Sequence, residues 1–354
     1  MKNSLYIVLI FLFVQPLQAD YQFYRGVRQM GMGGASIAVV NDETSVLSNP
    51  NGLGRLRDYF FTVIDPELTT SADGSDTLLG TAVFGSANPQ ELYDDLSDKI
   101  AQPYYFKSQV FPSVVMQNFG IGVLGKYEVL AQRNVDGTYD YLYQNDYSLN
   151  LAYNMKFWGG RIKVGFAGHL INRVEYFGTR DPAVESLSIS SFASEGMGIG
   201  VDTGLTLTAP WRYLPTLAVL VRDIGGTAFT AGGGLFGNGV NGTPQYISQS
   251  IDAAVAFSPI YGKYSRGVFT VEYTGVDDTE NVTDHMDRLH IGTEVNLWDA
   301  YFLRAGWHAN DWTAGLEYSV GVFQWQLATY SEEINLGTLA DRDRRGVLKF
   351  AFRF

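Results

Sequence analysis

The sequence predicts an all-β fold, a transmembrane antiparallel β-barrel of about 14 strands with a small N-terminal hatch. Three observations predict this fold. Apolar and polar residues alternate over successive segments from residue 109 onward. The chain ends in a strand with an aromatic residue at nearly every second position. Beyond the N-terminal segment, no apolar run approaches the ~20 residues that a membrane-spanning helix requires.

The C-terminal strand is the strongest single feature. Side chains of a strand alternate between two faces, so residues 347–354 divide into two sets. One face holds Leu348, Phe350, Phe352 and Phe354, and the other holds Val347, Lys349, Ala351 and Arg353. A barrel turns such an aromatic face to lipid and its polar face to the lumen. An ordinary edge strand is the alternative interpretation.

This ending resembles the signal by which bacterial outer-membrane barrels are recognised for insertion. The resemblance implies that the strand ending at Phe354 contacts the barrel-assembly machinery. It also implies that the mature barrel contacts outer-membrane lipid and lipopolysaccharide.

The same alternation recurs in earlier segments. Between residues 161 and 177, an apolar face lies opposite Lys163, His169, Arg173 and Glu175. Comparable segments with polar or charged residues opposite an apolar face are 288–297, 301–308, 314–320 and 323–327. A soluble sandwich rarely places so many charges opposite its buried faces, with Trp and Tyr near the strand ends.

The connections between these segments predict the topology. Short connections near 118–120, 158–160, 210–212, 259–264, 298–300 and 321 alternate with mostly longer ones near 132–138, 178–195, 224–245, 276–284, 310–312 and 334–344. This asymmetry is typical of bacterial outer-membrane barrels, whose strand number is even. One strand must therefore precede residue 109. Residues 59–65 are the best candidate for it, and residues 77–84 are the alternative. Residues 88–100 predict a helix, either a lid over the barrel or a solvated loop helix.

Residues 1–19 predict a secretory signal peptide. Lys2 supplies a positive charge, residues 5–14 are apolar, and cleavage is expected near Ala19. The chain contains no Cys, which excludes lipoprotein attachment, disulfides and thiolate metal sites. The formal net charge of −12 argues against nucleic-acid binding. Export and the barrel pattern together predict a protein of the bacterial outer membrane.

Residues 20–57 form the expected hatch, and residues 58–354 form the expected barrel. The hatch contains the sequence Arg25-Gly26-Val27-Arg28-Gln29-Met30-Gly31-Met32-Gly33-Gly34-Ala35, then Asn41-Asp42-Glu43-Thr44 and Asn49-Pro50-Asn51-Gly52-Leu53. It does not match a dinucleotide site, because Ser36 stands where the third Gly belongs, and it lacks the Lys-Ser/Thr of a P-loop. The small residues instead predict a compact plug, in which Gly31, Gly33 and Gly34 pack closely and Asn49-Pro50 makes a turn.

This hatch sequence resembles the N-terminal hatch of the FadL-like outer-membrane family, which includes long-chain fatty-acid and aromatic-hydrocarbon channels. The family's usual Asn-Pro-Ala is Asn49-Pro50-Asn51 here. The resemblance implies passive uptake of a hydrophobic molecule, with capture by outer loops, a lumen blocked by the hatch, and exit through a gap in the wall. PorV-like and TraF-like barrels share the motif, so a non-transporting scaffold for protein secretion or conjugation is the alternative function.

For transport, the candidate ligand-binding residues lie in the hatch, the outer loops and the lumen. The hatch candidates are Gly31, Gly33, Gly34, Asn49 and Pro50; the loop candidates are Phe192, Phe229, Leu235 and Phe236; the lumen cations are Arg173, Arg222 and Arg304. The arginines could bind a carboxylate head group. The alternative, which we favour, is that they pair with Glu175, Glu294 and Glu317 in an interior network.

No catalytic residue, metal or cofactor is expected. Asp284-His285-Met286-Asp287 has the residue types of a His–Asp pair or a partial zinc site, but the chain lacks a G-x-S-x-G setting for a serine nucleophile. A histidine that forms an ordinary hydrogen bond is the simpler interpretation. The sequence therefore does not predict an enzyme.

Overall fold

The computed structural model describes residues 22–72, 100, 102–181, 192–231, 234–237, 242–278, 285–336 and 339–354. The expected signal peptide, the alternative first strand at 77–84 and nearly all of the expected helix at 88–100 lie outside the described residues. Within the described residues, no helix is long and apolar enough to cross a membrane.

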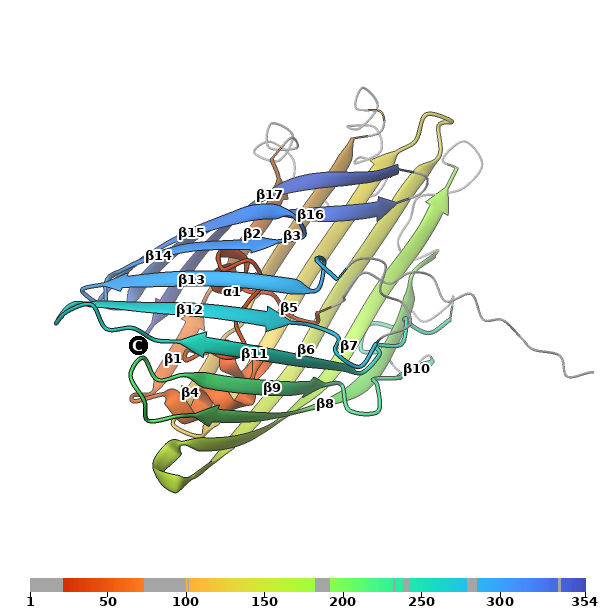
Figure 1. The fold of residues 1–354 in the computed structure, drawn as a ribbon. Helices are drawn as coiled ribbons and strands as arrows, with labels where there is room; N and C mark the ends of the chain where they lie inside the picture. The colour runs from red at the N-terminus through yellow and green to blue at the C-terminus, as the bar shows by residue number, and fades with distance from the viewer. Residues whose placement is uncertain are drawn as a thin grey trace, which may run out of the picture.

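The described chain forms one closed antiparallel barrel of 14 strands, as the sequence predicts (Figure 1). Three of these strands are interrupted, so the barrel is made of more segments than strands. The segments are β1 (Phe60–Ile64), β2 (Glu67–Ser71), β3 (Pro103–Val110), β4 (Ser113–Met116), β5 (Phe119–Arg133), β6 (Tyr139–Phe157), β7 (Ile162–Arg180), β8 (Ser194–Thr208), β9 (Thr216–Arg222), β10 (Phe229–Ala231), β11 (Ser250–Phe257), β12 (Ser265–Tyr273), β13 (Leu289–Leu297), β14 (Tyr301–His308), β15 (Asp311–Val320), β16 (Phe323–Leu336) and β17 (Leu339–Arg353). β17 closes the barrel by pairing with both β1 and β2.

The alternation seen in the sequence separates an outer apolar face from an inner polar face. On β6, the exposed side chains Tyr147, Leu149, Leu151 and Tyr153 alternate with the buried side chains Asp146, Ser148, Asn150 and Asn154. On β17, Leu348 is exposed while Lys349 is buried, as the alternation predicts. The inner polar residues are buried because the hatch and the opposite wall cover them.

The two ends of the barrel differ in their connections. We call the end with the turns 117–118, 158–161, 209–215, 258–264, 298–300 and 321–322 the short-turn end. The C-terminus lies at this end (Figure 1). Exposed aromatic residues stand in these turns, among them Trp158, Trp211 and Trp298. At the opposite end, which we call the long-loop end, β2, β7 and β10 end and β3, β8 and β11 begin.

Two of the connections expected at the long-loop end are short or largely strand. The connection near 310–312 is Ala309-Asn310, in which both residues have positive φ, as two-residue hairpins require. The expected loop at 334–344 is wrong, because β16 continues to Leu336 and β17 begins at Leu339. Asp343 of this segment belongs to β17 and pairs with Arg345 of the same strand at 2.7 Å.

The segment 22–56, which we call the hatch, lies inside the barrel toward the short-turn end (Figure 1). It contains the helix α1 (Val27–Gly31), the helical turn α2 (Ser45–Ser48) and the 3₁₀ helix η1 (Pro50–Arg55). Its apolar residues Val46, Leu47 and Leu53 are fully buried against wall residues such as Val115 and Ala152. The hatch therefore packs as part of the barrel interior.

Candidate functional site: the hatch, the lumen and an interrupted wall

The hatch glycines predicted to pack closely do so against the wall. A Cβ at Gly31 would lie 3.1 Å from the Cα of Gly315 on β15. Gly33 has a φ of +65°, and a Cβ there would lie 2.7 Å from the carbonyl oxygen of Ile291 and the backbone nitrogen of Trp307. Gly34 also has positive φ and lies against the ring of His290. Only glycine allows the hatch backbone to touch β13, β14 and β15 in this way.

Asn49 and Pro50 organise the end of the hatch. The Asn49 side chain donates to the carbonyl oxygen of Ile37 at 2.7 Å and accepts from the backbone N–H of Asn51 at 3.0 Å. Asn49 thereby caps η1, with Pro50 in its first turn. Both residues thus act on the backbone of the hatch itself. Their role as ligand-binding residues stays a prediction.

Asn51 stands where the FadL-like hatch pattern has Ala. Glycines in the barrel wall make room for it. A Cβ at Gly165 on β7 would lie 2.8 Å from the backbone nitrogen of Asn51, and a Cβ at Gly204 on β8 would clash with its side-chain amide. The Asn51 side chain also accepts from Asn154 at 3.5 Å. The larger residue is thus compatible with a hatch that lies directly on β6–β8.

Arg28 anchors the hatch to the opposite wall. Its guanidinium donates two hydrogen bonds to Glu294 on β13, both at 2.9 Å, and pairs with Asp42 of the hatch at 2.9 Å. Burial raises the pKa of the Asp42 carboxyl group, but Arg28 and the hydrogen bonds from Thr44 outweigh burial and hold that pKa below its ordinary value. Arg28 therefore joins two parts of the hatch to each other and to the barrel.

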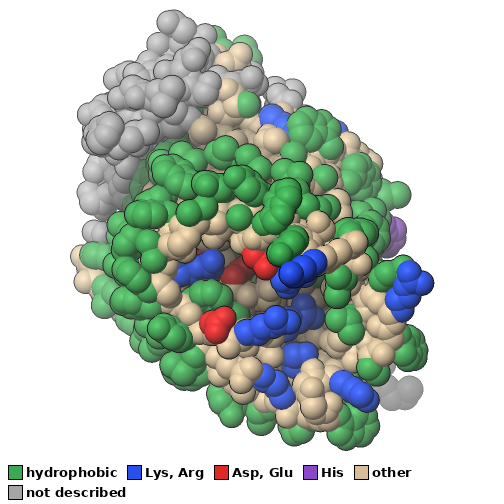
Figure 2. Space-filling view, turned by 90° about the vertical axis from the view of Figure 1, so that its left-hand side faces the viewer, with side chains coloured by type: hydrophobic (Ala, Val, Ile, Leu, Met, Phe, Trp, Pro, Cys, Tyr) green, Lys and Arg blue, Asp and Glu red, His purple; other side chains and the backbone are tan. Residues whose placement is uncertain are grey.

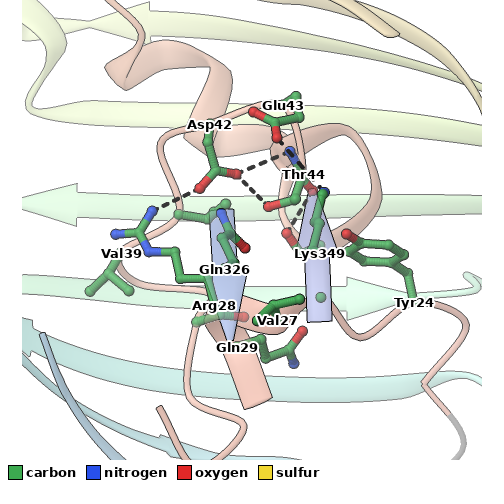
Figure 3. A pocket seen from close by; sticks show the side chains of 14 residues that line it. Tyr24, Val27, Arg28, Gln29, Val39, Asp42, Glu43, Thr44, Gln326 and Lys349 are labelled. Atoms are coloured by element: carbon green, nitrogen blue, oxygen red, sulfur yellow. Dashed lines mark hydrogen bonds and ion pairs between the residues drawn. The ribbon is translucent and has the colours of Figure 1, made fainter. Parts of the chain in front are cut away.

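A second anchor joins the hatch to the last strand (Figure 3). Glu43 pairs with Arg353 at 3.0 Å and lies 3.9 Å from Lys349, and Lys349 pairs with Asp65 at 2.9 Å. A small cavity of about 20 Å³ lies between Glu43, Lys349, Tyr24 and Arg28. This cavity has room for one or two water molecules, and its polar lining suits water better than an apolar ligand.

Apolar and backbone contacts complete the seal. Met32, Ile37, Ala38 and Val39 pack against Ala218, Leu220, Ala254 and Ala256 of β9 and β11. Glu272 of β12 accepts hydrogen bonds from the backbone N–H groups of Ser36 and Ile37 at 2.7 and 3.0 Å. With the contacts to β5–β8 and β13–β17, the hatch touches strands on every side of the lumen. It blocks the described lumen at this level.

The three lumen arginines are all paired with carboxylates. Arg304 lies between Glu294, at 2.7 Å, and Glu317. Arg173 binds Asp146 through two nitrogens, at 2.8 and 3.0 Å, and lies 3.6 Å from Glu175. Arg222 pairs with Asp252 at 2.6 Å. This arrangement is the interior network favoured from the sequence, with Asp146 and Asp252 as partners that the sequence did not indicate.

The four aromatic and aliphatic loop candidates lie at three separate places. Phe229 on β10 is buried in the lumen with Ile171 and Ile247. Phe192 is buried with the tyrosines of β3 and β6, and Leu235 and Phe236 are exposed. These residues do not lie together in the described structure, and a capture site formed from them stays a prediction.

An aromatic cluster around Phe192 is a feature that the sequence analysis missed. It contains Tyr104, Tyr139, Tyr141, Tyr143 and Phe192, with the Tyr176 and Phe192 ring centroids 4.4 Å apart. The β6 tyrosines share the outward face with Tyr147, since all have odd numbers on one unbroken strand. The period-two spacing of tyrosines at 139, 141 and 143 was the available signal.

The wall is interrupted where β1 meets β2 and β3 meets β4. β1 pairs with β4 up to Thr62 and Ser113, and β2 pairs with β3 from Glu67 and Gln109. Pro66 and Pro112 stand in the two breaks and have no N–H to donate. The Asp65 carboxylate accepts the Phe111 N–H instead, and the Phe111 ring lies inside, 6.4 Å from the Tyr24 ring. The ladder between these two strands is therefore broken beside the hatch.

Three of the four histidines form ordinary hydrogen bonds. His285 contacts the Tyr273 hydroxyl at 2.8 Å, while Asp284 lies outside the described residues. His290 holds the Gly33 carbonyl at 2.7 Å, and His169 lies between Asn150 and Asp202. Among the described residues, no group of three His, Asp or Glu side chains is placed to hold a metal ion.

Comparison with known proteins places this architecture. No family model matches the sequence, and no curated protein matches it. Solved structures do match: a TodX monoaromatic hydrocarbon channel variant has a TM-score of 0.56 and 13% identity, covering 95% of this chain and 100% of that one. The chain has the fold of a hydrocarbon channel. This agrees with the FadL-like resemblance of the hatch sequence.

Two further channels support the same fold. The CymD monoaromatic hydrocarbon channel has a TM-score of 0.54 and 11% identity, covering 93% of this chain and 96% of its own. The toluene transporter TbuX of Ralstonia pickettii has a TM-score of 0.51 and 13% identity, covering 93% of this chain and 98% of its own.

Proposed function

We propose that the chain is a FadL-like outer-membrane channel for passive uptake of hydrophobic molecules, either hydrocarbons or long-chain fatty acids. Residues 1–19 act as the signal peptide, 20–57 as the hatch and 58–354 as the barrel. Outer-membrane lipid and lipopolysaccharide surround the barrel, and the strand that ends at Phe354 contacts the assembly machinery. The short-turn end then faces the periplasm.

One observation supports this proposal most directly, a continuous apolar track from the lumen to the interrupted wall. The part of the track inside the lumen consists of Phe229, Ile171 and Ile247, and Phe23 of the hatch packs against them. Phe23 also packs against a second apolar cluster, between the hatch and the wall, which contains Phe111 and Val115. Phe111 borders the break between the first two barrel strands.

An apolar solute gains free energy along such a track. The hatch fills the lumen, so a polar solute has no open aqueous path there. A hydrophobic molecule instead exchanges contacts with Phe229, Phe23 and Phe111 and leaves beside Pro112 toward lipid. The paired lumen arginines are not needed for this route.

Uptake by living cells tests the proposal. Cells carrying the chain are compared with empty cells for uptake of labelled toluene and labelled oleate. We expect faster uptake of at least one of them, and a several-fold loss with Phe23→Asp, which places a charge in the track. Val135→Asp, at a fully exposed loop position, is the matched control.

If the transport test fails, the alternative function, a non-transporting scaffold for protein secretion or conjugation, is favoured. No difference from empty cells for either solute would contradict the channel. Equal uptake by the Phe23→Asp variant would leave the channel but contradict the track.

A further inference from the structure

Three cations gather at the short-turn end of the lumen with no counter-ion from the part of the chain that the structure describes. Lys156 at the end of β6 and Lys163 at the start of β7 are direct cross-strand partners. Arg55 ends the hatch helix η1, and a Cβ at the preceding Gly54 would lie 2.9 Å from the Lys163 side chain. None of these three side chains pairs with an Asp or Glu among the described residues, in contrast to Arg173, Arg222 and Arg304.

This arrangement is unfavourable unless something negative occupies it. Like charges directly opposite each other on neighbouring strands destabilise a sheet. Lys163 is only 6% exposed, and its ammonium group donates at 2.6 Å to the carbonyl oxygen of Gly160, a neutral acceptor. Burial and the charge of Arg28 lower the pKa of the Arg55 guanidinium to about 10. Buried charges in proteins are otherwise paired.

The buried hydroxyl group of Thr206 lies beside these cations and has no hydrogen-bond partner among the described residues. Thr206 on β8 is the cross-strand partner of Lys163 and is 1% exposed. Lys156, Lys163 and Thr206 thus form one row on the inner face of β6, β7 and β8. Figure 2 looks onto this end and shows Lys and Arg side chains, with some Asp and Glu, around the central hollow.

We propose that Arg55, Lys156, Lys163 and Thr206 form a binding site for a phosphate group, which fixes the last turn of the hatch to β6–β8. Two ammonium groups, a guanidinium and a hydroxyl supply donors for several phosphate oxygens. A phosphate group carries close to two negative charges at neutral pH and so offsets more of the three positive charges than a carboxylate does. The site lies apart from the apolar track and does not depend on the transported solute.

The test uses the purified full chain in a neutral detergent, titrated with sodium phosphate at constant ionic strength. Calorimetry should show saturable binding for the wild type. Lys163→Gln should weaken it at least about tenfold, the loss expected for one charge-assisted hydrogen bond, and Arg55→Gln/Lys163→Gln should abolish it. Lys263→Gln is the matched control, an ammonium group in another short turn that lies 5.1 Å from the Tyr264 ring. It should bind phosphate like the wild type.

Two sources of the phosphate group are separated by a second arm. If a lipid head group fills the site, nanodiscs with phosphatidylglycerol should stabilise the wild type more than Lys163→Gln. If a free anion fills it, inorganic phosphate should stabilise the wild type more than Lys163→Gln. Either result supports the site. Acetate that binds as tightly as phosphate would overturn the phosphate assignment.

Thermal unfolding separates binding from a structural role. Without phosphate, Lys163→Gln should be at least as stable as the wild type, because the substitution removes repulsion. With phosphate, the wild type should become the more stable of the two. A variant that is less stable in both buffers, or phosphate binding that is equal in all variants, would overturn the proposal.

Discussion

Gly33 is a single residue on which the close packing of the hatch against β13 and β14 depends. Its φ of +65° disfavours any other residue, and the backbone of β13 and β14 occupies the space of a Cβ. We expect Gly33→Ala to cost roughly 2–3 kcal/mol of hatch attachment, from conformational strain and overpacking combined. Unfolding in urea and trypsin cleavage within the hatch would measure this cost.

Gly137 is the matched control for that substitution. It also has positive φ, at +88°, but nothing lies within 4 Å of a Cβ there. Gly137→Ala should therefore cost about 1 kcal/mol and leave the hatch protected from trypsin. Equal protection in both variants would contradict the close packing at Gly33.

Arg304 is expected to stabilise the barrel without contacting a transported solute. Arg304→Met would leave Glu294 and Glu317 buried with fewer partners, at a cost of about 3 kcal/mol. Arg266→Met removes an arginine whose pair with Asp299 is exposed, and it should cost at most ~1 kcal/mol. Urea unfolding of both variants measures the difference. Unchanged stability with lost oleate uptake would instead make Arg304 a ligand contact.

The pairing of the lumen arginines was predictable only in part. The sequence showed that arginines and glutamates share inner faces, and Arg304 does pair with Glu294 and Glu317. It could not show that Arg173 prefers Asp146 or that Arg222 binds Asp252, because the relative register of neighbouring strands selects these partners. The loop residues Phe192 and Phe236 were less predictable still, since no periodicity indicates where a loop folds.

At the scale of elements, the hatch is a rigid insert held from several strands. A disulfide between α1 and β16 would test whether it must move during uptake. A Cβ at Gly31 lies 3.6 Å from the Cβ of Ala328, within the range for disulfides, and the chain has no native Cys.

We expect oxidised Gly31→Cys/Ala328→Cys to transport solutes at a rate close to that of its reduced form, because the apolar track passes beside α1 and not through it. The single-cysteine variants control for the tight fit of Gly31 against Gly315. A several-fold, reversible loss on oxidation would show instead that α1 moves during transport. Uptake of labelled toluene before and after reduction measures the effect.

Strand positions were predictable from alternation, but their interruptions and some ends were not. The expected first strand at 59–65 is present as β1, and the even strand count holds. The strand continues past Pro66 as β2, because Asp65 and Pro66 break the ladder without ending the strand. The polar segment 334–344 was misjudged as a loop, because charges that pair along the wall, such as Asp343 with Arg345, look in sequence like solvent-exposed charges.

At the scale of the whole molecule, the charge distribution follows the architecture. The net charge of −12 coexists with paired cations in the lumen and an unneutralised cationic row at the short-turn end. The barrel pattern and the hatch sequence predicted the fold, which the hydrocarbon channels share. Neither pattern could indicate the cationic row, which arises from the contact between η1 and β6–β8.

The most direct measurement is the selectivity of uptake by cells that carry the chain. Uptake of labelled toluene and oleate is measured beside that of a small hydrophilic dye, for the wild type and for a variant lacking residues 31–53. The hatch-closed channel predicts faster entry of a hydrophobic solute and no entry of the dye, with dye entry only after the deletion. Wild-type cells that admit the dye, or that take up neither toluene nor oleate faster than empty cells, would contradict it.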